Sequence, residues 1–412
     1  MIKRLVKSSI VKNTFWLTLL QVGSYAAQIL LIPVLTRRLS IEEFGATMAA
    51  LAVNQLAFVV TDYGFSLSGT YEVSKSKGNR SAIQGIINRI HSAKFILVVL
   101  AISLTIIVSY IPTYYPYQSI FVISIISIIG RAFQPVWFFQ GIEDMRFYAT
   151  YMSLVKFIYV FVAISIVQGP GDGYLVLLSL GVADVFGASI GLWGIYKLSY
   201  EVHRLSIADS VAGLAKSFEY FLSRLAVAVY TSASAIIVGL SGLTQVAVYA
   251  SAEQVYRAGQ SVTVPINQAL YPFMARTKEF DLLIKIIPYI IIVLFIGSLV
   301  IGYFAYPIVE LVFGPKYVNA VPVLRVFLLT VIINYIGISF GYPMFAALGR
   351  PNLVNKTVLI GCATHFVFIV FLFITNSISA INIVICMAFT ESIVACLRVS
   401  IAFRLINKCP PE

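Results

Sequence analysis

Charged side chains interrupt the long apolar stretches of this sequence, and they are the residues best placed to do chemistry. Those that lie about ten or more residues inside such a stretch are Arg131, Lys156, Asp184, Arg224, Glu253, Arg257 and Glu391. A charge placed in hydrocarbon costs at least about 2.5–3.5 kcal/mol. A chain that repeats this cost is expected to turn these side chains toward a polar interior, which is typical of a transport pathway.

The basic members of this set indicate an anionic substrate. Arg131, Arg224 and Arg257, together with Lys156, are expected near mid-depth in the membrane. Arginine offers a planar fork of donors that suits phosphate oxygens. A substrate that carries a pyrophosphate is therefore physically reasonable.

The acidic members are candidates for binding a coupling proton or sodium ion. They are Asp62, Asp184, Glu253 and Glu391. Asp184 and Glu391 lie in stretches with few other polar groups, so each is either a packing residue or an ion-coupling residue. Glu253 and Arg257 are one helical turn apart, so either they neutralise each other or Arg257 faces a ligand.

Uncharged polar side chains form stripes at helical spacing. In the eighth apolar stretch, Gln260 and Asn267 share a narrow arc with Glu253 and Arg257. Other stripes contain Gln21 and Gln28 in the first stretch, and Asn54 in the second. Such stripes either hydrogen-bond neighbouring helices or line a polar pathway.

The elements that carry these residues are predicted to be membrane-spanning helices. The chain has 412 residues, of which 59% are hydrophobic and 11% charged, whereas soluble domains carry about 25% charged residues. An all-α polytopic membrane protein is therefore expected. Its twelve predicted spans are 14–36, 43–66, 85–109, 117–140, 147–167, 173–196, 214–239, 245–272, 284–306, 322–347, 353–374 and 380–404.

Basic residues occur in every second connection between these spans. Because positive loops stay in the cytoplasm, both termini are predicted to be cytoplasmic. Arg37 and Arg38 depart from this pattern. They either meet the membrane edge or belong to the outer mouth of a cavity.

A weak internal repeat indicates two halves. PVWFFQG at 135–141 and PMFAALG at 343–349 share a proline and a glycine at equal spacing, 208 residues apart. With six spans in each half, duplication predicts two six-helix lobes around a central cleft. The predicted divisions are 1–200 for the N-terminal lobe, 201–213 for a cytoplasmic linker and 214–412 for the C-terminal lobe.

Several classes of function find no support. The net charge of +12 is spread over short loops, so nucleic-acid binding is not expected. The sequence contains no metalloprotease, phosphate-loop or nucleophile-elbow motif, and its four cysteines show no zinc spacing. We therefore expect no enzyme activity, no metal and no cofactor.

Several motifs resemble those of the Wzx-type polysaccharide flippases, a family of the multidrug/oligosaccharidyl-lipid/polysaccharide exporter superfamily. The most suggestive is RAFQPVWFFQGIEDM at 131–145, and IPVLTRRLSIEEFG at 32–45 and ALGRPNLVNK at 347–356 are also similar. The resemblance implies a twelve-helix, two-lobed fold in the bacterial inner membrane. It also implies transfer of an undecaprenyl-diphosphate-linked O-antigen repeat unit from the cytoplasmic to the periplasmic leaflet.

The same resemblance places a cationic cavity on Arg131, Lys156, Arg224 and Arg257, with Asp62 as its acidic member. The candidate substrate contacts are therefore Arg257, Arg224, Arg131, Lys156, Glu253, Asp62, Gln21, Gln28, Asn54, Gln260 and Asn267. The implied partners are the lipid-linked oligosaccharide, membrane lipid, H⁺ or Na⁺ as coupling ion, and other membrane proteins of polysaccharide assembly.

The predicted mechanism is alternating access, in which the two lobes rock around the cleft. One rival is a drug or cation antiporter of the same superfamily, which would favour a net acidic cavity. A second rival is a membrane-bound polymerase or glycosyltransferase, which would need a large outer loop or soluble domain with catalytic groups.

Overall fold

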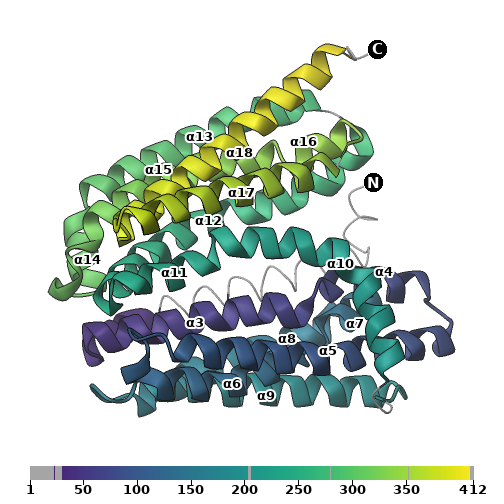
Figure 1. Ribbon diagram of the computed structural model, residues 1–412. Coiled ribbons are helices and arrows are strands. Elements are labelled where there is room, and N and C mark those ends of the chain that lie inside the picture. Colours follow the sequence, from purple (N-terminus) through teal and green to yellow (C-terminus); the bar gives the residue numbers. More distant parts are fainter. Residues whose placement is uncertain (1–22, 24–29, 203–205, 279, 351, 409–412) are drawn as a thin grey trace. The chain divides into compact units, whose positions relative to one another are not determined.

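The computed structural model describes residues 23, 30–202, 206–278, 280–350 and 352–408. This part of the chain is helical throughout its regular structure and contains no strand (Figure 1). Its α-helices are α3 (Ile41–Asp62), α4 (Phe65–Lys75), α5 (Arg80–Ser109), α6 (Gln118–Ala132), α7 (Val136–Gly141), α8 (Met145–Ile166), α9 (Gly173–Lys197), α10 (Ile207–Tyr230), α11 (Ser232–Val238), α12 (Leu243–Thr277), α13 (Phe280–Tyr303), α14 (Ala305–Val312), α15 (Ala320–Ser339), α16 (Tyr342–Ala347), α17 (Asn352–Ile374) and α18 (Ala380–Lys408).

Within the described residues, ten helices or joined helix pairs are long and apolar enough to cross a membrane. The protein is therefore an all-α, multi-pass membrane protein, as predicted. The predicted span 245–272 corresponds to α12, which has 35 residues and is not among these ten. The predicted span 14–36 falls mostly outside the described residues, so the count of twelve and the cytoplasmic placement of both termini stay predictions.

Several predicted spans consist of two helices separated by a break. The span 43–66 divides at Tyr63 and Gly64, which have φ angles of 46° and 81°. The left-handed backbone at the second position favours glycine. A Cβ atom at Gly64 would also lie 2.6 Å from the Cβ atom of Tyr220, so this break lets α10 approach closely.

Three further breaks have local causes in the sequence. Pro135, which lacks an N–H group, separates α6 from α7. Gly341 precedes α16, which has Pro343 in its first turn, and Thr231 separates α10 from α11. The repeated segments 135–141 and 343–349 thus take the same local form, a short helix that follows a break.

The chain divides into two units, Met1–Ala228 (unit 1) and Val229–Glu412 (unit 2). Unit 1 therefore extends into α10, whereas the lobe boundary predicted from the sequence lies in the linker 201–213. The predicted lobes stay a prediction, but Ser217, Phe221 and Arg224 of α10 contact residues 62–68, which precede the linker.

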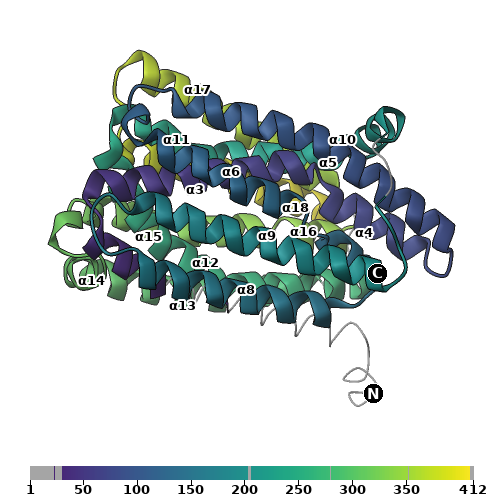
Figure 2. The same ribbon diagram turned by 90° about the horizontal axis from the view of Figure 1, so that it is seen from below.

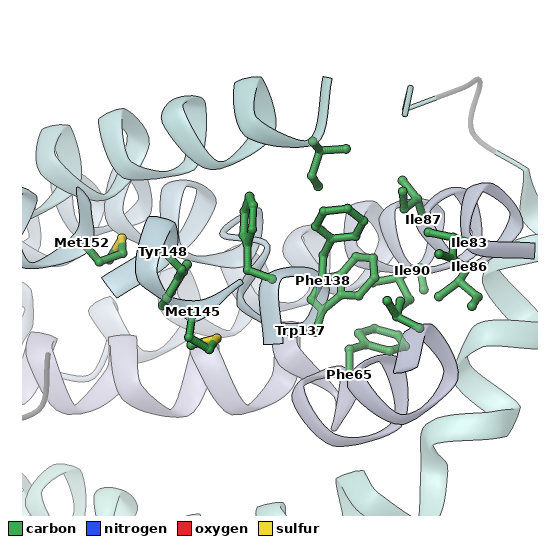
Figure 3. Close-up of a cluster of buried hydrophobic side chains, with 14 of the residues drawn as sticks. Phe65, Ile83, Ile86, Ile87, Ile90, Trp137, Phe138, Met145, Tyr148 and Met152 are labelled. Carbon is green, nitrogen blue, oxygen red and sulfur yellow. The ribbon is translucent and has the colours of Figure 1, made fainter. Parts of the chain in front are cut away.

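In unit 1, α6 packs most extensively against α9, and Figures 1 and 2 both show these helices side by side. A cluster of buried hydrophobic side chains holds the short helices of the breaks. Figure 3 shows Trp137 and Phe138 of α7 beside Phe65 of α4 and Ile90 of α5. Because α4 and α7 are too short to be stable alone, this packing fixes where both breaks lie.

The connection between α8 and α9 in unit 1 is held by two charged side chains. The guanidinium group of Arg38 donates to the carbonyl of Ile164 and, at 2.6 Å, to that of Val167, where α8 ends. Glu43 accepts from the backbone N–H of Gly173, where α9 begins. Each charge has the sign that the adjoining helix end favours. Arg38 therefore stabilises the α8–α9 connection.

In unit 2, α15 packs most extensively against α18, and α12 packs against α15. Helix α17 lies against α18. These contacts bring polar side chains of α12, α15 and α18 together.

Candidate functional site

Asp62 is buried at the end of α3 and forms an ion pair with Arg224 of α10. Its carboxylate also accepts from the Ser66 hydroxyl, and from the Ser66 backbone N–H at 3.3 Å. That N–H belongs to the first turn of α4, which has no intrahelical partner for it. The α3–α4 break therefore lets one carboxylate cap α4 and neutralise Arg224.

Asp184 is buried on α9 and faces α6. It accepts from the Ser127 hydroxyl at 2.6 Å and from the Gln134 side-chain amide at 3.2 Å. Gln134 lies in the break that precedes α7. Asp184 therefore fastens α9 to both α6 and its break, which fits the packing interpretation, although its ion-coupling role stays a prediction.

Arg131 and Lys156 surround the same carboxylate. Asp184 attracts both side chains electrostatically, and the two cations repel each other. The guanidinium carbon of Arg131 lies 4.2 Å from the centroid of the Phe58 ring, a cation–π arrangement. These residues form a mixed-charge cluster inside unit 1.

Asn54, a predicted substrate contact on α3, is only 3% exposed. Neither atom of its side-chain amide has a hydrogen-bond partner among the described residues. A buried amide without partners is uncommon in folded proteins. Gln21 and Gln28, the other predicted contacts of the N-terminal half, lie outside the described residues.

In unit 2, Glu253 and Arg257 form an ion pair of 2.9 Å along α12. This geometry fits mutual neutralisation, but 40% of the Arg257 side chain remains exposed. A half-exposed guanidinium can be reached by a ligand. Both interpretations of Arg257 therefore stay open, and its role stays a prediction.

The other predicted residues of unit 2 belong to hydrogen-bonded chains. The Gln260 side chain donates to the Asn334 carbonyl oxygen at 2.9 Å, and Asn334 in turn lies beside the buried carboxylate of Glu391. The Ser339 hydroxyl donates to the side-chain oxygen of Asn267 at 3.3 Å. Gln260 and Glu391 thus fasten α12, α15 and α18 together.

Two buried cations were missed by the sequence analysis. Lys94 of α5 is 3% exposed, and its ammonium donates to the backbone carbonyl of Ala132. Arg398 of α18 is 7% exposed and donates to the Gly337 carbonyl at 2.7 Å and to the Thr357 hydroxyl at 2.9 Å. The available signal was the presence of a basic residue well inside each apolar stretch.

The carbonyls bound by Lys94 and Arg398 lie in equivalent surroundings. Each belongs to the last turn of a helix that stops at a break, α6 for Ala132 and α15 for Gly337. The last carbonyls of a helix lack intrahelical donors and must find other partners inside a membrane. A buried cation satisfies one such carbonyl in each unit.

The resulting charge clusters differ between the units. In unit 1, Asp62 and Asp184 are surrounded by four basic side chains, Lys94, Arg131, Lys156 and Arg224. In unit 2, Arg257 pairs with Glu253, and Arg398 interacts with Glu391. Across the described residues, no group of three or more His, Cys, Asp or Glu side chains could hold a metal ion.

Comparison with known proteins gives a family match and two similar curated relatives. The family model described as "Polysaccharide biosynthesis protein" matches residues 10–278. A "Putative O-antigen transporter" of Escherichia coli (strain K12) is 27% identical over 336 residues, 78% of this chain and 79% of the relative. Another, of Shigella dysenteriae, is 25% identical over 371 residues, 87% of this chain and 91% of the relative.

Solved structures share the fold. The lipid II flippase MurJ in an inward closed conformation has a TM-score of 0.78 at 11% identity, covering 94% of this chain and 87% of its own. An inward-facing multidrug resistance MATE family transporter of the MOP superfamily has a TM-score of 0.70 at 12% identity, covering 96% of both chains. At these identities the likeness concerns the fold alone.

Proposed function

Because the chain belongs to the polysaccharide biosynthesis protein family, we propose that it is a flippase for a lipid-linked oligosaccharide. The proposed substrate is an O-antigen or similar polysaccharide repeat unit linked to undecaprenyl diphosphate. It moves from the cytoplasmic to the periplasmic leaflet of a bacterial inner membrane. The relatives named as putative O-antigen transporters and the fold shared with a lipid II flippase support this proposal.

The observation that carries the proposal is the excess of basic side chains around Asp62 and Asp184 in unit 1. A surplus of buried positive charge is costly unless an anion joins it. A diphosphate brings several negative oxygens, and arginine can bind them in pairs. Arg131, Arg224 and Lys156 are the proposed diphosphate contacts of unit 1, and Arg257 is that of unit 2.

Uncharged amides suit the sugar part of the substrate. Asn54 has an unpartnered buried amide, which is what an incoming hydroxyl group would satisfy. Gln21, Gln28, Gln260 and Asn267 are the other proposed sugar contacts, and the polyprenyl tail would remain in membrane lipid. We propose that no chemical bond is made or broken during transfer.

We propose alternating access driven by an ion gradient, with H⁺ or Na⁺ as the coupling ion. Asp62, Asp184, Glu253 and Glu391 are the candidate acidic sites. Other membrane proteins of polysaccharide assembly are proposed partners, because a transferred repeat unit must be polymerised or attached outside.

Deletion of the gene tests the function directly. The expected result is accumulation of undecaprenyl-linked single repeat units in the cytoplasmic leaflet and loss of surface polymer, both reversed by the wild-type gene. A deletion strain with normal surface polymer would refute the proposal. If that strain also became sensitive to cationic drugs, the rival drug antiporter would be favoured instead.

A further inference from the structure

Lys94 is a buried titratable group to which the proposed function assigns no substrate contact. It lies in the middle of the apolar helix α5 and is 3% exposed. An ammonium group has three N–H donors, yet the Ala132 carbonyl is the one hydrogen-bond acceptor that the described residues provide. Burial with so few acceptors disfavours the charged form of a lysine. Lys94 can therefore hold a proton stably only if a negative charge compensates it.

The acidic side chain that acts electrostatically on Lys94 is Asp62 of α3, and α3 packs against α5. That carboxylate is already engaged by Arg224 through an ion pair and by Ser66 through hydrogen bonds. Arginine stays protonated under all ordinary conditions, whereas lysine can lose its proton. Two cations, Lys94 and Arg224, thus interact with one buried carboxylate. Of the two, Lys94 can lose its positive charge by giving up a proton.

Arg224 lies on the helix by which the chain leaves unit 1. Helix α10 ends at Tyr230, and unit 2 begins at Val229. Further contacts hold α10 to the rest of unit 1. The Ser68 and Ser217 hydroxyl oxygens lie 2.7 Å apart, and the Tyr63 and Phe221 rings stack with centroids 4.2 Å apart.

We propose that Lys94 is a proton-binding site that competes with Arg224 for Asp62. When the Lys94 amine takes a proton from water, the resulting ammonium attracts the Asp62 carboxylate. This attraction weakens the ion pair between Asp62 and Arg224. Helix α10 is then released from α3 and α4. When Arg224 returns to Asp62, Lys94 gives the proton back to water. By linkage, proton binding and α10 docking oppose each other to the same extent.

The remaining charged groups around this site are few. They are Asp62 on α3, His91 on α5 itself, Arg131 on α6 and Arg224 on α10. The His91 ring bonds the Ile87 carbonyl at 2.9 Å through Nδ1. His91 is the other side chain of α5 at this site whose charge can depend on pH, so any test must separate it from Lys94.

The position of α10 can be measured without any transport assay. Spin labels are placed on full-length protein at Tyr71 of α4 and Phe218 of α10, both exposed, after replacement of the native cysteines. Pulsed electron resonance then gives the distance between labels from about pH 6 to about pH 10, a range that brackets most buried lysines. As pH falls, the ratio of released to docked α10 should rise by up to about tenfold per pH unit, the limit for one proton.

Variants assign this response to Lys94. Lys94→Met should abolish the pH dependence and keep α10 docked, while His91→Gln should leave the dependence unchanged. Lys94→Arg, with a permanent charge, should give a pH-independent and more released α10. A wild-type distance that does not change with pH, or a Lys94→Met protein that still responds, would overturn the proposal.

The use of this site in ion coupling rests on the flippase function proposed above, whereas the competition itself does not. Lys94→Arg keeps a donor for the Ala132 carbonyl but cannot release a proton, so it should fail to restore surface polymer at normal protein level. Full restoration would reduce Lys94 to a structural role. If the deletion strain kept its surface polymer, the flippase proposal would fail. The distance measurement would still test whether Lys94 and Arg224 compete for Asp62.

Discussion

Two of the broken helices, one in each unit, bind a freed carbonyl with different cations. In unit 1 the carbonyl of Ala132, before the α6–α7 break, is bound by Lys94 of α5. In unit 2 the carbonyl of Gly337, before the α15–α16 break, is bound by Arg398 of α18. A break in a membrane helix frees carbonyls that lipid cannot satisfy, so each unit supplies an internal donor.

The acidic residues near these breaks follow the spacing of the internal repeat more closely than the cations do. Asp184 and Glu391 lie 207 residues apart, and Pro135 and Pro343 lie 208 apart. Each acid faces the broken helix of its own unit, Asp184 through Ser127 and Gln134, and Glu391 through Asn334. The acids thus occupy related positions, whereas the cations come from unrelated helices.

The difference in cation type has a consequence for each unit. Arg398 cannot be deprotonated in a protein, so the α15–α16 break keeps its donor permanently. Lys94 can lose its charge, so the α6–α7 break has a donor whose strength can vary. The charge cluster of unit 1 therefore has a cation whose charge can vary, together with a surplus of basic groups. In the charge cluster of unit 2, each basic side chain has an acidic partner and Arg398 keeps its charge.

The largest expected effect is from removal of the fixed cation. Arg398→Met should lower the free energy of unfolding by about 3–5 kcal/mol, because Glu391 and the Gly337 carbonyl lose a buried partner. The fraction of monodisperse protein after detergent extraction and the thermal midpoint measure this. Arg398→Lys, which keeps a charge and a donor, should recover much of the loss. A methionine variant as stable as wild type would show that Arg398 does not stabilise the α15–α16 break.

Arg224→Ala should be nearly as damaging, since it leaves Asp62 buried without its ion-pair partner. A loss of about 3–5 kcal/mol is expected from breaking a buried pair. The double variant Asp62→Asn, Arg224→Gln removes both charges and should be more stable than Arg224→Ala alone. Additive losses for Asp62→Asn, Arg224→Gln and their double variant, measured by thermal unfolding, would show that the two side chains do not interact.

Arg257→Ala should leave protein level unchanged and abolish restoration of surface polymer in the deletion strain, while Arg257→Lys should restore part of it. The half-exposed guanidinium contributes little to stability, so its loss should affect substrate binding alone. Immunoblotting and polymer staining measure the two quantities. Full restoration by the alanine variant would assign Arg257 to neutralising Glu253.

A smaller effect is expected at Asp184. Asp184→Asn keeps an oxygen acceptor for Ser127 or Gln134 but removes the charge that attracts Arg131, so stability should fall by about 1–3 kcal/mol. Glu391→Gln is the matched variant of unit 2. It should lose less stability, because the charge cluster of that unit has no surplus of basic groups. Equal losses, compared by thermal midpoint, would remove the distinction between the clusters.

Orientation can be checked with almost no perturbation. Single cysteines at Thr113 and Leu243 should react with an impermeant maleimide from outside the cell, and one at Lys77 should react only after permeabilisation. Thr113 and Lys77 lie in connections between helices, and Leu243 is the first residue of α12. Reaction of the Lys77 position from outside would reverse the predicted topology.

The sequence predicted the helical membrane fold because long apolar runs can only be helices in lipid. Helical spacing left the Glu253–Arg257 pair as one of two interpretations, and the resemblance placed Asp62 and Arg224 in one cavity without pairing them. Lys94 and Arg398 were missed because their main partners are backbone carbonyls, which leave no pattern in side-chain types. The role of Asp184 as a fastener of the α6–α7 break depends on Gln134, 50 residues away, and only packing reveals it.

The ion pair between α3 and α10 can form only after both of its residues have been synthesised. Asp62 and Arg224 are 162 residues apart in the chain, which corresponds to roughly 10–30 s of synthesis at about 5–20 residues per second. During that interval the membrane holds a carboxylate whose arginine has not yet been made. A ribosome that stalls between the two residues would leave Asp62 exposed to quality-control proteases, so truncated chains are expected to be degraded quickly.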